Sequence, residues 1–241
     1  MSKDEIHKIC EKYYIKNYII NNDLSIDVNG NIDLDRKKLT ELPLSFNVIK
    51  GNFVCSSNYL NTLKGSPNTV DGDFLCNNNN LTTLEHSPQI VTGLYACSFN
   101  KLKSLKGCPT FINNDFICDR TSIKSFDGAP QYIKYNFSCA ANNIRTLRNC
   151  PKYGETIDLT NNPIHQIFKL FIKQDKIMGV IMPGMSLKKE RELIEYFNEL
   201  DVIQKRGRAT VVVLDRLNYF LQDIGKPEVD GSKIKKMKVL Y

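Results

Sequence analysis

Long hydrophobic runs are missing from this chain of 241 residues. No apolar stretch approaches the roughly 18 residues that a transmembrane helix needs, which excludes a membrane-spanning protein. The first residues, Met1 to Glu5, already include acidic side chains, and no apolar segment follows them. This start is unlike a secretory signal. With 41% hydrophobic and 24% charged residues, the composition is that of an ordinary globular protein. We therefore expect a cytoplasmic protein that makes no membrane contact.

The sequence also lacks the usual signatures of metal and catalytic sites. It has eight cysteines but no C-x-x-C pair, and its three histidines are scattered. Zinc ligands, in contrast, cluster in close pairs. There is no glycine-rich phosphate loop, and no cysteine follows Cys150 that could serve as a nucleophile in the C-terminal region. We expect no enzyme activity, no catalytic residues, no metal site and no cofactor.

The sequence does contain a repeat of 21 residues. In each unit an aromatic residue lies two positions before a cysteine, and an asparagine lies three positions after it, except in the unit where Thr121 replaces the asparagine. A fixed long period of this kind indicates stacked structural repeats. With leucine in place of the cysteine, the pattern extends to Leu34 and Leu159. It predicts about seven turns over residues 32–167. The repeated cysteines, called the cysteine column below, are Cys55, Cys76, Cys97, Cys118 and Cys139.

The residue types of the unit predict its structure. An aromatic residue, a variable residue and a cysteine in alternation indicate a short strand with one buried face. Such strands stack in parallel when every turn covers the apolar edge of its neighbour. The asparagine follows the strand, where its amide can pair with backbone groups of its own turn and of the next one. A unit of 21 residues has no room for a full helix, so we expect a helix-poor solenoid with buried, reduced cysteines.

The stretch from Phe74 to Leu81, Phe-Leu-Cys-Asn-Asn-Asn-Asn-Leu, resembles a leucine-rich repeat. It is most similar to the short cysteine-bearing repeats of bacteriophage and bacterial proteins. Residues 26–34 resemble the segment that leads into such repeats, and the resemblance covers about residues 18–172. It implies a leucine-rich-repeat solenoid with a parallel sheet on its concave face, a role in protein–protein contact, and the host cytoplasm as location for a phage-encoded chain.

Three regions are expected along the chain. Residues 1–31 are predicted to form an N-terminal cap, with a helix from Asp4 to about Tyr14 and a hairpin around Asn29-Gly30. Residues 32–167 are the solenoid. Residues 168–241 are predicted to form a mainly α capping or accessory module. Its expected helices cover 164–172, 186–204 and 208–224, with a strand as the alternative for the three valines at 211–213.

A candidate protein-binding surface follows from the strand pattern. Residues next to the cysteine point away from the core, and several of them are apolar, which predicts an exposed apolar patch with a polar rim. We interpret it as the contact site for a protein partner, a host or phage factor. The alternatives are that these residues only favour strand formation, or that terminal elements or self-association cover them. The predicted contact residues are Val54, Asp73, Leu75, Leu94, Ala96, Phe99, Asp115, Ile117 and Arg120.

A second candidate surface is basic and lies near the C-terminus. The chain has a net charge of +7, and most of this excess lies after residue 162. Clustered cations can bind phosphates, although no aromatic residues are interleaved with these. Nucleic-acid association and a virion or structural role are therefore kept as alternatives to protein recognition. The possible nucleic-acid contacts are Lys205, Arg206, Arg208, Lys233, Lys235 and Lys236.

Overall fold

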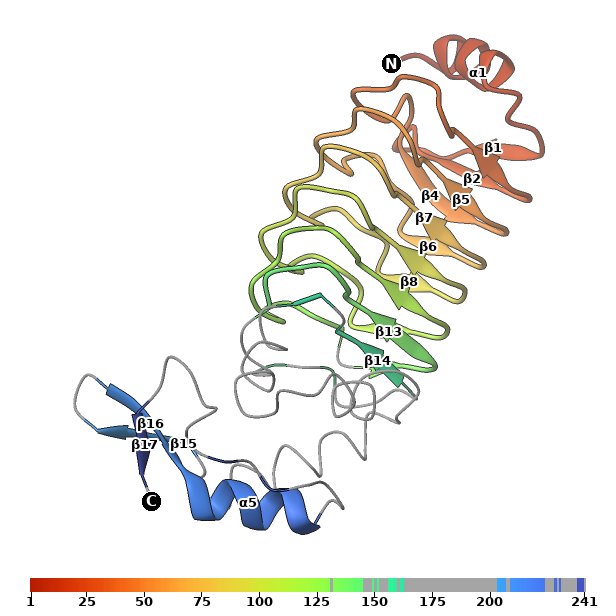
Figure 1. Cartoon of the computed structure of the whole chain (residues 1–241). Helices are drawn as coiled ribbons and strands as arrows, with labels where there is room; N and C mark the ends of the chain where they lie inside the picture. The colour runs from red at the N-terminus through yellow and green to blue at the C-terminus, as the bar shows by residue number, and fades with distance from the viewer. Residues whose placement is uncertain are drawn as a thin grey trace.

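About five coils with a spacing of 21 residues form a parallel-sheet solenoid (Figure 1). The computed structural model describes residues 1–130, 132–144, 149, 151, 156–159, 161–162, 203–206, 209–223, 228, 230 and 238–240. The predicted repeat is confirmed, but the regular coils are fewer than the seven expected. The two flanking turns with leucine in place of cysteine contribute strands β3 (Ile32–Asp33) and β14 (Thr156–Asp158) to one sheet.

Each regular coil contributes two short strands, one to each of two sheets. Neighbouring strands pair in parallel in both sheets, apart from the antiparallel pair β1–β2. Sheet B contains the predicted strand before the cysteine, whereas the strand of sheet A was not predicted. Sheet A consists of β1 (Tyr18–Ile20), β2 (Ile26–Val28), β4 (Phe46–Ile49), β6 (Thr69–Val70), β8 (Ile90–Val91), β10 (Phe111–Ile112) and β12 (Tyr132–Ile133). Sheet B consists of β3, β5 (Phe53–Val54), β7 (Phe74–Leu75), β9 (Tyr95–Ala96), β11 (Phe116–Ile117), β13 (Asn136–Ser138) and β14.

A tight corner joins the two strands of each coil, and glycine stacks on glycine there. A Cβ added to Gly72 would lie 2.8 Å from the carbonyl carbon of Gly51 in the preceding coil. Gly93 is placed against Gly72 in the same way. Because real Cβ atoms do not approach backbone so closely, glycine is required at positions 72 and 93. The two following coils have Asn114 and Tyr135 at the equivalent position.

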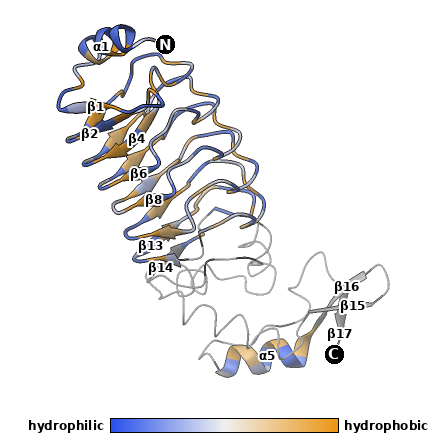
Figure 2. Cartoon of the chain, turned by 180° about the vertical axis from the view of Figure 1, so that it is seen from behind, coloured by the Kyte–Doolittle hydropathy of each residue, from blue (hydrophilic) through white to orange (hydrophobic). Residues whose placement is uncertain are grey.

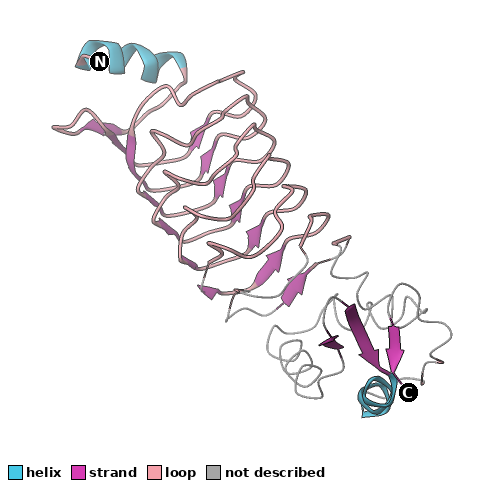
Figure 3. Ribbon diagram, turned by 90° about the vertical axis from the view of Figure 1, so that its left-hand side faces the viewer, coloured by secondary structure: helices cyan, strands magenta, loops and turns pink. Residues whose placement is uncertain are grey.

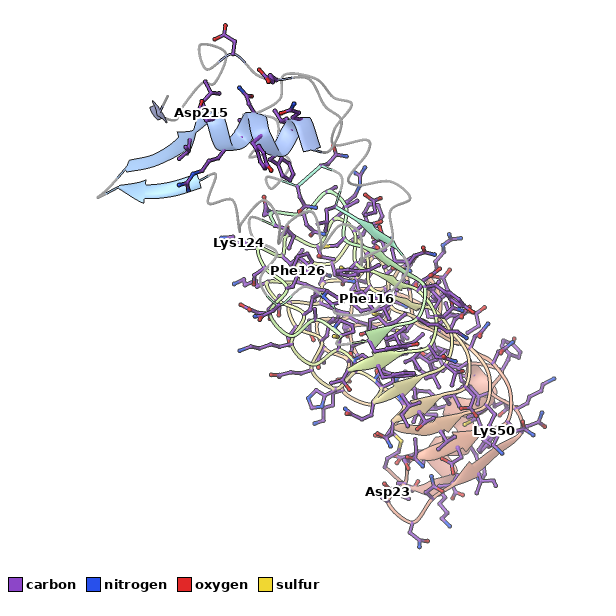
Figure 4. The ribbon with its side chains drawn as sticks, turned by 90° about the horizontal axis from the view of Figure 1, so that it is seen from below. Asp23, Lys50, Phe116, Lys124, Phe126 and Asp215 are labelled. Atoms are coloured by element: carbon purple, nitrogen blue, oxygen red, sulfur yellow. The ribbon has the colours of Figure 1, made fainter. Side chains whose placement is uncertain are left out.

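The interior of the solenoid is built from columns of identical or similar side chains. The cysteine column is fully buried, as predicted, and the ring column beside it has neighbouring centroids 5.2–5.7 Å apart. Figure 2 shows most of the strands as hydrophobic. In Figure 4, Phe116 and Phe126 lie inside the coils and Lys124 lies at their outside. The ring column consists of Phe53, Phe74, Tyr95, Phe116 and Phe137.

The asparagine column links successive coils, as predicted. The Asn79 amide donates to the carbonyl oxygens of Cys55 and Cys76 at 3.0 and 3.2 Å. Its Oδ1 accepts the N–H of Leu60 at 3.0 Å. The side chain therefore satisfies backbone groups of two coils that have no access to water. The equivalent pattern recurs at Asn58, Asn100 and Asn162.

The turn that contains Thr121 is built differently from the others. The Thr121 hydroxyl lies 3.1 Å from the Cys118 carbonyl oxygen and 2.8 Å from Asn142 Oδ1, and either oxygen can accept its single proton. Asn142 Oδ1 also accepts the backbone N–H groups of Thr121 and Ser122. Ser122 has φ 77°, a left-handed conformation that Lys38 of the first turn also adopts but that Tyr59 and Lys101 do not. One asparagine oxygen of the next coil therefore holds this turn.

The N-terminal segment contains the predicted helix, but its hairpin lies elsewhere. Helix α1 (Lys3–Lys12) starts with a capping box between Ser2 and Glu5 and is mostly hydrophilic in Figure 2. The hairpin is formed by β1 and β2, and its turn spans residues 21–25. Asp23 accepts the N–H of Ser25 there, which is the usual way an aspartate closes a turn. The prediction of a hairpin around Asn29-Gly30 is therefore wrong.

The C-terminal part contains more strand than predicted. Strands β15 (Ile203–Arg206), β16 (Ala209–Val213) and β17 (Lys238–Leu240) form a three-stranded sheet, and α5 (Leu214–Asp223) follows β16 (Figure 3). The helix expected from residue 208 therefore begins only at Leu214, because three consecutive β-branched valines favour a strand. The helix expected to end at Gln204 also conflicts with β15. The predicted helices over 164–172 and 186–202 lie outside the described residues.

Candidate protein-binding surface

The structure brings the predicted apolar residues together on the outer face of sheet B. This face comprises the residues one and three positions before, and one and two positions after, each column cysteine, Leu34 or Leu159. Val54 pairs with Leu75, Leu75 with Ala96, and Ile117 with Ala96. Adjacent strands lie about 4.8 Å apart, so these side chains form one continuous row. Val54, Leu75 and Ile117 are half-buried and Ala96 is buried. The side chains of the row therefore project only a little above the surface of the sheet.

A ladder of polar side chains flanks this row on one side. Each member accepts the backbone N–H of the equivalent residue in the next coil. Asn52 Oδ1 accepts from Asp73 at 2.9 Å, and Asp73 Oδ1 accepts from Leu94 at 2.8 Å. Leu94 has no acceptor, but the ladder resumes where Asp115 Oδ1 accepts from Asn136 at 2.7 Å. Asp73 and Asp115, predicted as polar rim, thus border the apolar row and also hold successive coils together.

A second ladder lies on the other side of the row, one residue after the cysteine. Asn77 Oδ1 accepts the N–H of Ser98, and Ser98 Oγ accepts the N–H of Asp119, at 2.8 and 3.0 Å. Asp119 Oδ1 then accepts the N–H of Ala140 at 2.8 Å. The sequence analysis missed this ladder and its Asp119. The signal was present as polar residues directly after four of the five column cysteines.

Phe99 and Arg120 lie at the end of the strands, both in the left-handed region, with φ values of 56° and 53°. Phe99 is 53% exposed, and the Arg120 guanidinium carbon lies 5.4 Å from the centre of its ring. A non-glycine residue in this conformation costs roughly 1–2 kcal/mol. The chain therefore holds a large aromatic side chain in solvent in a strained conformation. The equivalent residues of the other coils, such as Ser57, Asn78 and Ala141, are also left-handed, so the conformation belongs to the repeat. Phe99 differs from them in placing a large aromatic side chain there.

The outer face of sheet B is acidic, although the whole chain is basic. Among its described residues there is no lysine. The exposed lysines of the solenoid lie elsewhere, for example Lys101, Lys103 and Lys124 on the loop side. The outer face therefore has a charge opposite to that of the protein as a whole. Its charged residues are Asp33, Asp35, Arg36, Asp73, Asp115, Asp119, Arg120 and Asp158.

Sheet A has a smaller apolar row that sequence reasoning missed. Ile90 and Phe111 are 52% and 48% exposed, and the rings of Phe111 and Tyr132 stack with centroids 4.6 Å apart. The three residues occupy the same position of successive coils, seven residues before the cysteine. The recurrence of large side chains at that position was the available signal. A strand of two residues shows no alternation by which its faces could be assigned.

The buried thiols of the cysteine column should be unreactive, because they stay protonated. Burial raises the pKa of Cys55 to about 12, and burial likewise raises the pKa values of Cys76, Cys97 and Cys118. A thiol that stays protonated is a poor nucleophile and a poor metal ligand. Over the part of the chain that the structure describes, no group of His, Cys, Asp and Glu is arranged to hold a metal ion.

The basic residues predicted near the C-terminus are only partly described. Lys205 and Arg206 lie in β15, whereas Arg208, Lys233, Lys235 and Lys236 lie outside the described residues.

Comparisons of this chain with protein-family models, with curated proteins and with solved structures give no match. Among the described helices, none is long and apolar enough to cross a lipid bilayer. Function is therefore inferred from the geometry of the chain itself.

Proposed function

We propose that this chain is a non-catalytic recognition protein that binds another protein through the outer face of sheet B. The continuous row of Val54, Leu75, Ala96 and Ile117 is the observation that carries the proposal. Contiguous apolar surface on a folded protein usually marks a contact site. The two flanking ladders hold the row in place before any partner arrives. Binding to a rigid surface loses less conformational entropy than binding to a mobile one.

Phe99 and Arg120 extend the proposed site beyond the strands. Aromatic residues and arginine are enriched among the side chains that dominate binding energy. A preference for strand residues explains Leu75 or Ile117 equally well, but it does not explain Phe99. Phe99 follows the strand β9 in a turn where asparagine or glycine is the favoured residue. Its side chain therefore supports a contact role more specifically than the residues of the row do.

The resemblance to short leucine-rich repeats supports the same proposal. In that reading, sheet B is the concave sheet of a leucine-rich-repeat solenoid, and its outer face is the surface such proteins use for protein contacts. The partner is then a host or phage protein, and the chain acts in the host cytoplasm. Nothing in the described C-terminal residues favours nucleic-acid binding over this function.

The proposal is tested by capturing partners with purified protein from native cells and identifying them by mass spectrometry. Leu75→Glu and Phe99→Glu each put a charge into the contact, where an unpaired charge is costly, and should abolish capture of the partner. Both should change the free energy of unfolding by no more than about 1 kcal/mol, because the side chains are not in the core.

Ile90→Glu is the matched control, since Ile90 lies on sheet A and is 52% exposed, close to the 53% of Phe99. It should leave capture intact. Loss of capture by Ile90→Glu alone would move the site to sheet A. Unchanged capture by both sheet B variants would refute the proposal. Loss of capture only when Lys205, Arg206 and Arg208 are neutralised would favour the nucleic-acid alternative.

A further inference from the structure

We infer that the partner presents a cationic segment, in which lysine or arginine side chains flank an apolar side chain. This inference rests on the proposed function of the outer face of sheet B and specifies the chemistry of its partner. It is carried by the aspartates that border the apolar row.

The carboxylates of Asp73, Asp115 and Asp119 each have one oxygen fixed and one oxygen open. In all three, Oδ1 accepts a backbone N–H of the next coil at 2.7–2.8 Å. Oδ2 has no hydrogen bond and no ion pair within the described residues. The ion pair that is present on this face joins Asp35 and Arg36, one turn before the row. The ladders therefore hold three carboxylates in place and leave an acceptor on each.

The three carboxylates surround the apolar row. Asp73 and Asp115 lie two coils apart in the same ladder, which corresponds to roughly 10 Å. Asp119 lies four residues beyond Asp115, roughly 13 Å along the strand direction. Leu75, Ala96 and Ile117 lie between the two ladders. An apolar side chain seated on the row would thus have a carboxylate on either side within reach of a lysine or arginine next to it.

Other partner chemistries fit this surface poorly. A purely apolar partner would cover the carboxylates and leave them without water or a counter-charge, which is costly. An acidic partner, or the phosphates of a nucleic acid, would meet like charge. Arg120 offsets only part of this charge, because it is one cation beside three aspartates, and its guanidinium lies over the Phe99 ring. Complementary charge across the contact therefore selects a cationic partner.

The test uses a fluorescent short peptide of alternating lysine and leucine, and a matched peptide with glutamate in place of lysine. Binding to the full chain is measured by fluorescence anisotropy at about 50 and about 200 mM salt. The cationic peptide should bind, more weakly at the higher salt, and the anionic peptide should not. Electrostatic attraction to the protein as a whole would not explain such binding, because the protein has a net charge of +7 and would repel a cationic peptide.

The decisive variant is Asp73→Asn combined with Asp115→Asn. Asparagine occupies the same ladder position at Asn31 and Asn52 and accepts the same N–H, so the coils should remain intact. Affinity for the cationic peptide should fall about tenfold or more. The control Asp71→Asn removes one negative charge, of the two removed by the double variant, at an exposed corner residue off this face, and it should leave the affinity within about twofold.

Equal binding of both peptides, or an equal loss of affinity in the Asp71 control, would overturn the inference. So would failure of the cationic peptide to bind at all. The two proposals can fail separately. If Leu75→Glu abolishes capture of the natural partner while the double asparagine variant captures it normally, recognition by this face stands and the cationic partner does not. If neither variant affects capture, both proposals fail.

Discussion

At the scale of single residues, the side-chain amide of asparagine replaces hydrogen bonds that a strand of two residues cannot make. One amide serves the carbonyls of two cysteines and an N–H of the preceding coil. This role was predictable, because the asparagine follows each cysteine at a fixed distance where the chain leaves the strand. The left-handed conformation two residues after each cysteine was not predictable, because residues such as Phe99, Arg120 and Ala141 give no local signal for it.

Asn79→Ala should lower the free energy of unfolding by about 2–5 kcal/mol. The change leaves the buried Leu60 N–H without an acceptor, and an unsatisfied buried group costs about 1–3 kcal/mol. It also removes one of the two amide donors to the Cys55 and Cys76 carbonyls, which Asn58 and Asn100 continue to serve, and each lost hydrogen bond costs about 1 kcal/mol. Denaturation by urea, followed by circular dichroism, measures the effect. Asn78→Ala is the neighbouring control at an exposed position, and it should cost much less. Equal costs at both positions would mean that the column does not stabilise the coils.

The buried cysteine column should make the free energy of unfolding fall as the pH rises into the alkaline range. Cys55 has a pKa of about 12 in the folded protein, above the ordinary value of about 8.5 expected when unfolded. The folded state therefore keeps a proton that the unfolded chain releases. The contribution is fully present below about pH 8.5 and is lost as the pH rises towards 12.

The urea midpoint should accordingly fall between about pH 8.5 and pH 10.5. Each such thiol contributes up to about 1.4 kcal/mol per pH unit. Cys55→Ala should make the fall shallower, whatever its effect on stability at neutral pH. An identical slope for the variant and the unmodified protein would contradict this assignment.

At the scale of elements, sheet B was predictable and sheet A was not. The strand of sheet B carries an aromatic residue and a cysteine on one face, which marks its direction and its buried side. From β6 to β12 the strand of sheet A has only one buried residue per coil, such as Val70 or Val91. It exists because the corner, which is glycine in some coils and Asn114 or Tyr135 in others, turns the chain abruptly and places the preceding residues against those of the next coil. The three valines of β16 show a similar limit, since strand preference overrode the helical pattern.

Gly72→Ala should destabilise the solenoid by about 2 kcal/mol or more, because its Cβ would overlap the backbone of Gly51. The backbone of a stacked coil cannot move aside without disturbing the neighbouring coils. Thermal unfolding measures the loss. Asn114→Ala tests the same corner in a later coil that already accommodates a Cβ, and it should be tolerated. A neutral Gly72→Ala would show that the corner is not tightly packed.

At the scale of the whole molecule, the residues that stabilise the solenoid and those proposed to bind a partner lie on opposite sides of the same strands. The inward residues form the core columns, and the outward residues form an apolar row between two polar ladders. Most of the proposed contact residues could be predicted, because the repeat fixes which positions face outward. The polar residues of the ladders also recur in the sequence, but the hydrogen bonds that they make between coils could not be predicted from it.

The central claim is that the outer face of sheet B is the binding surface. Its most direct test replaces Phe99 by the photoreactive analogue p-benzoylphenylalanine and irradiates native cells that contain the protein. The same replacement at Phe111, which is similarly exposed but lies on sheet A, is the matched control. The account predicts a discrete crosslinked protein partner from position 99 and none from position 111. A partner crosslinked from position 111 and not from position 99 would contradict it, as would the absence of any crosslink from position 99.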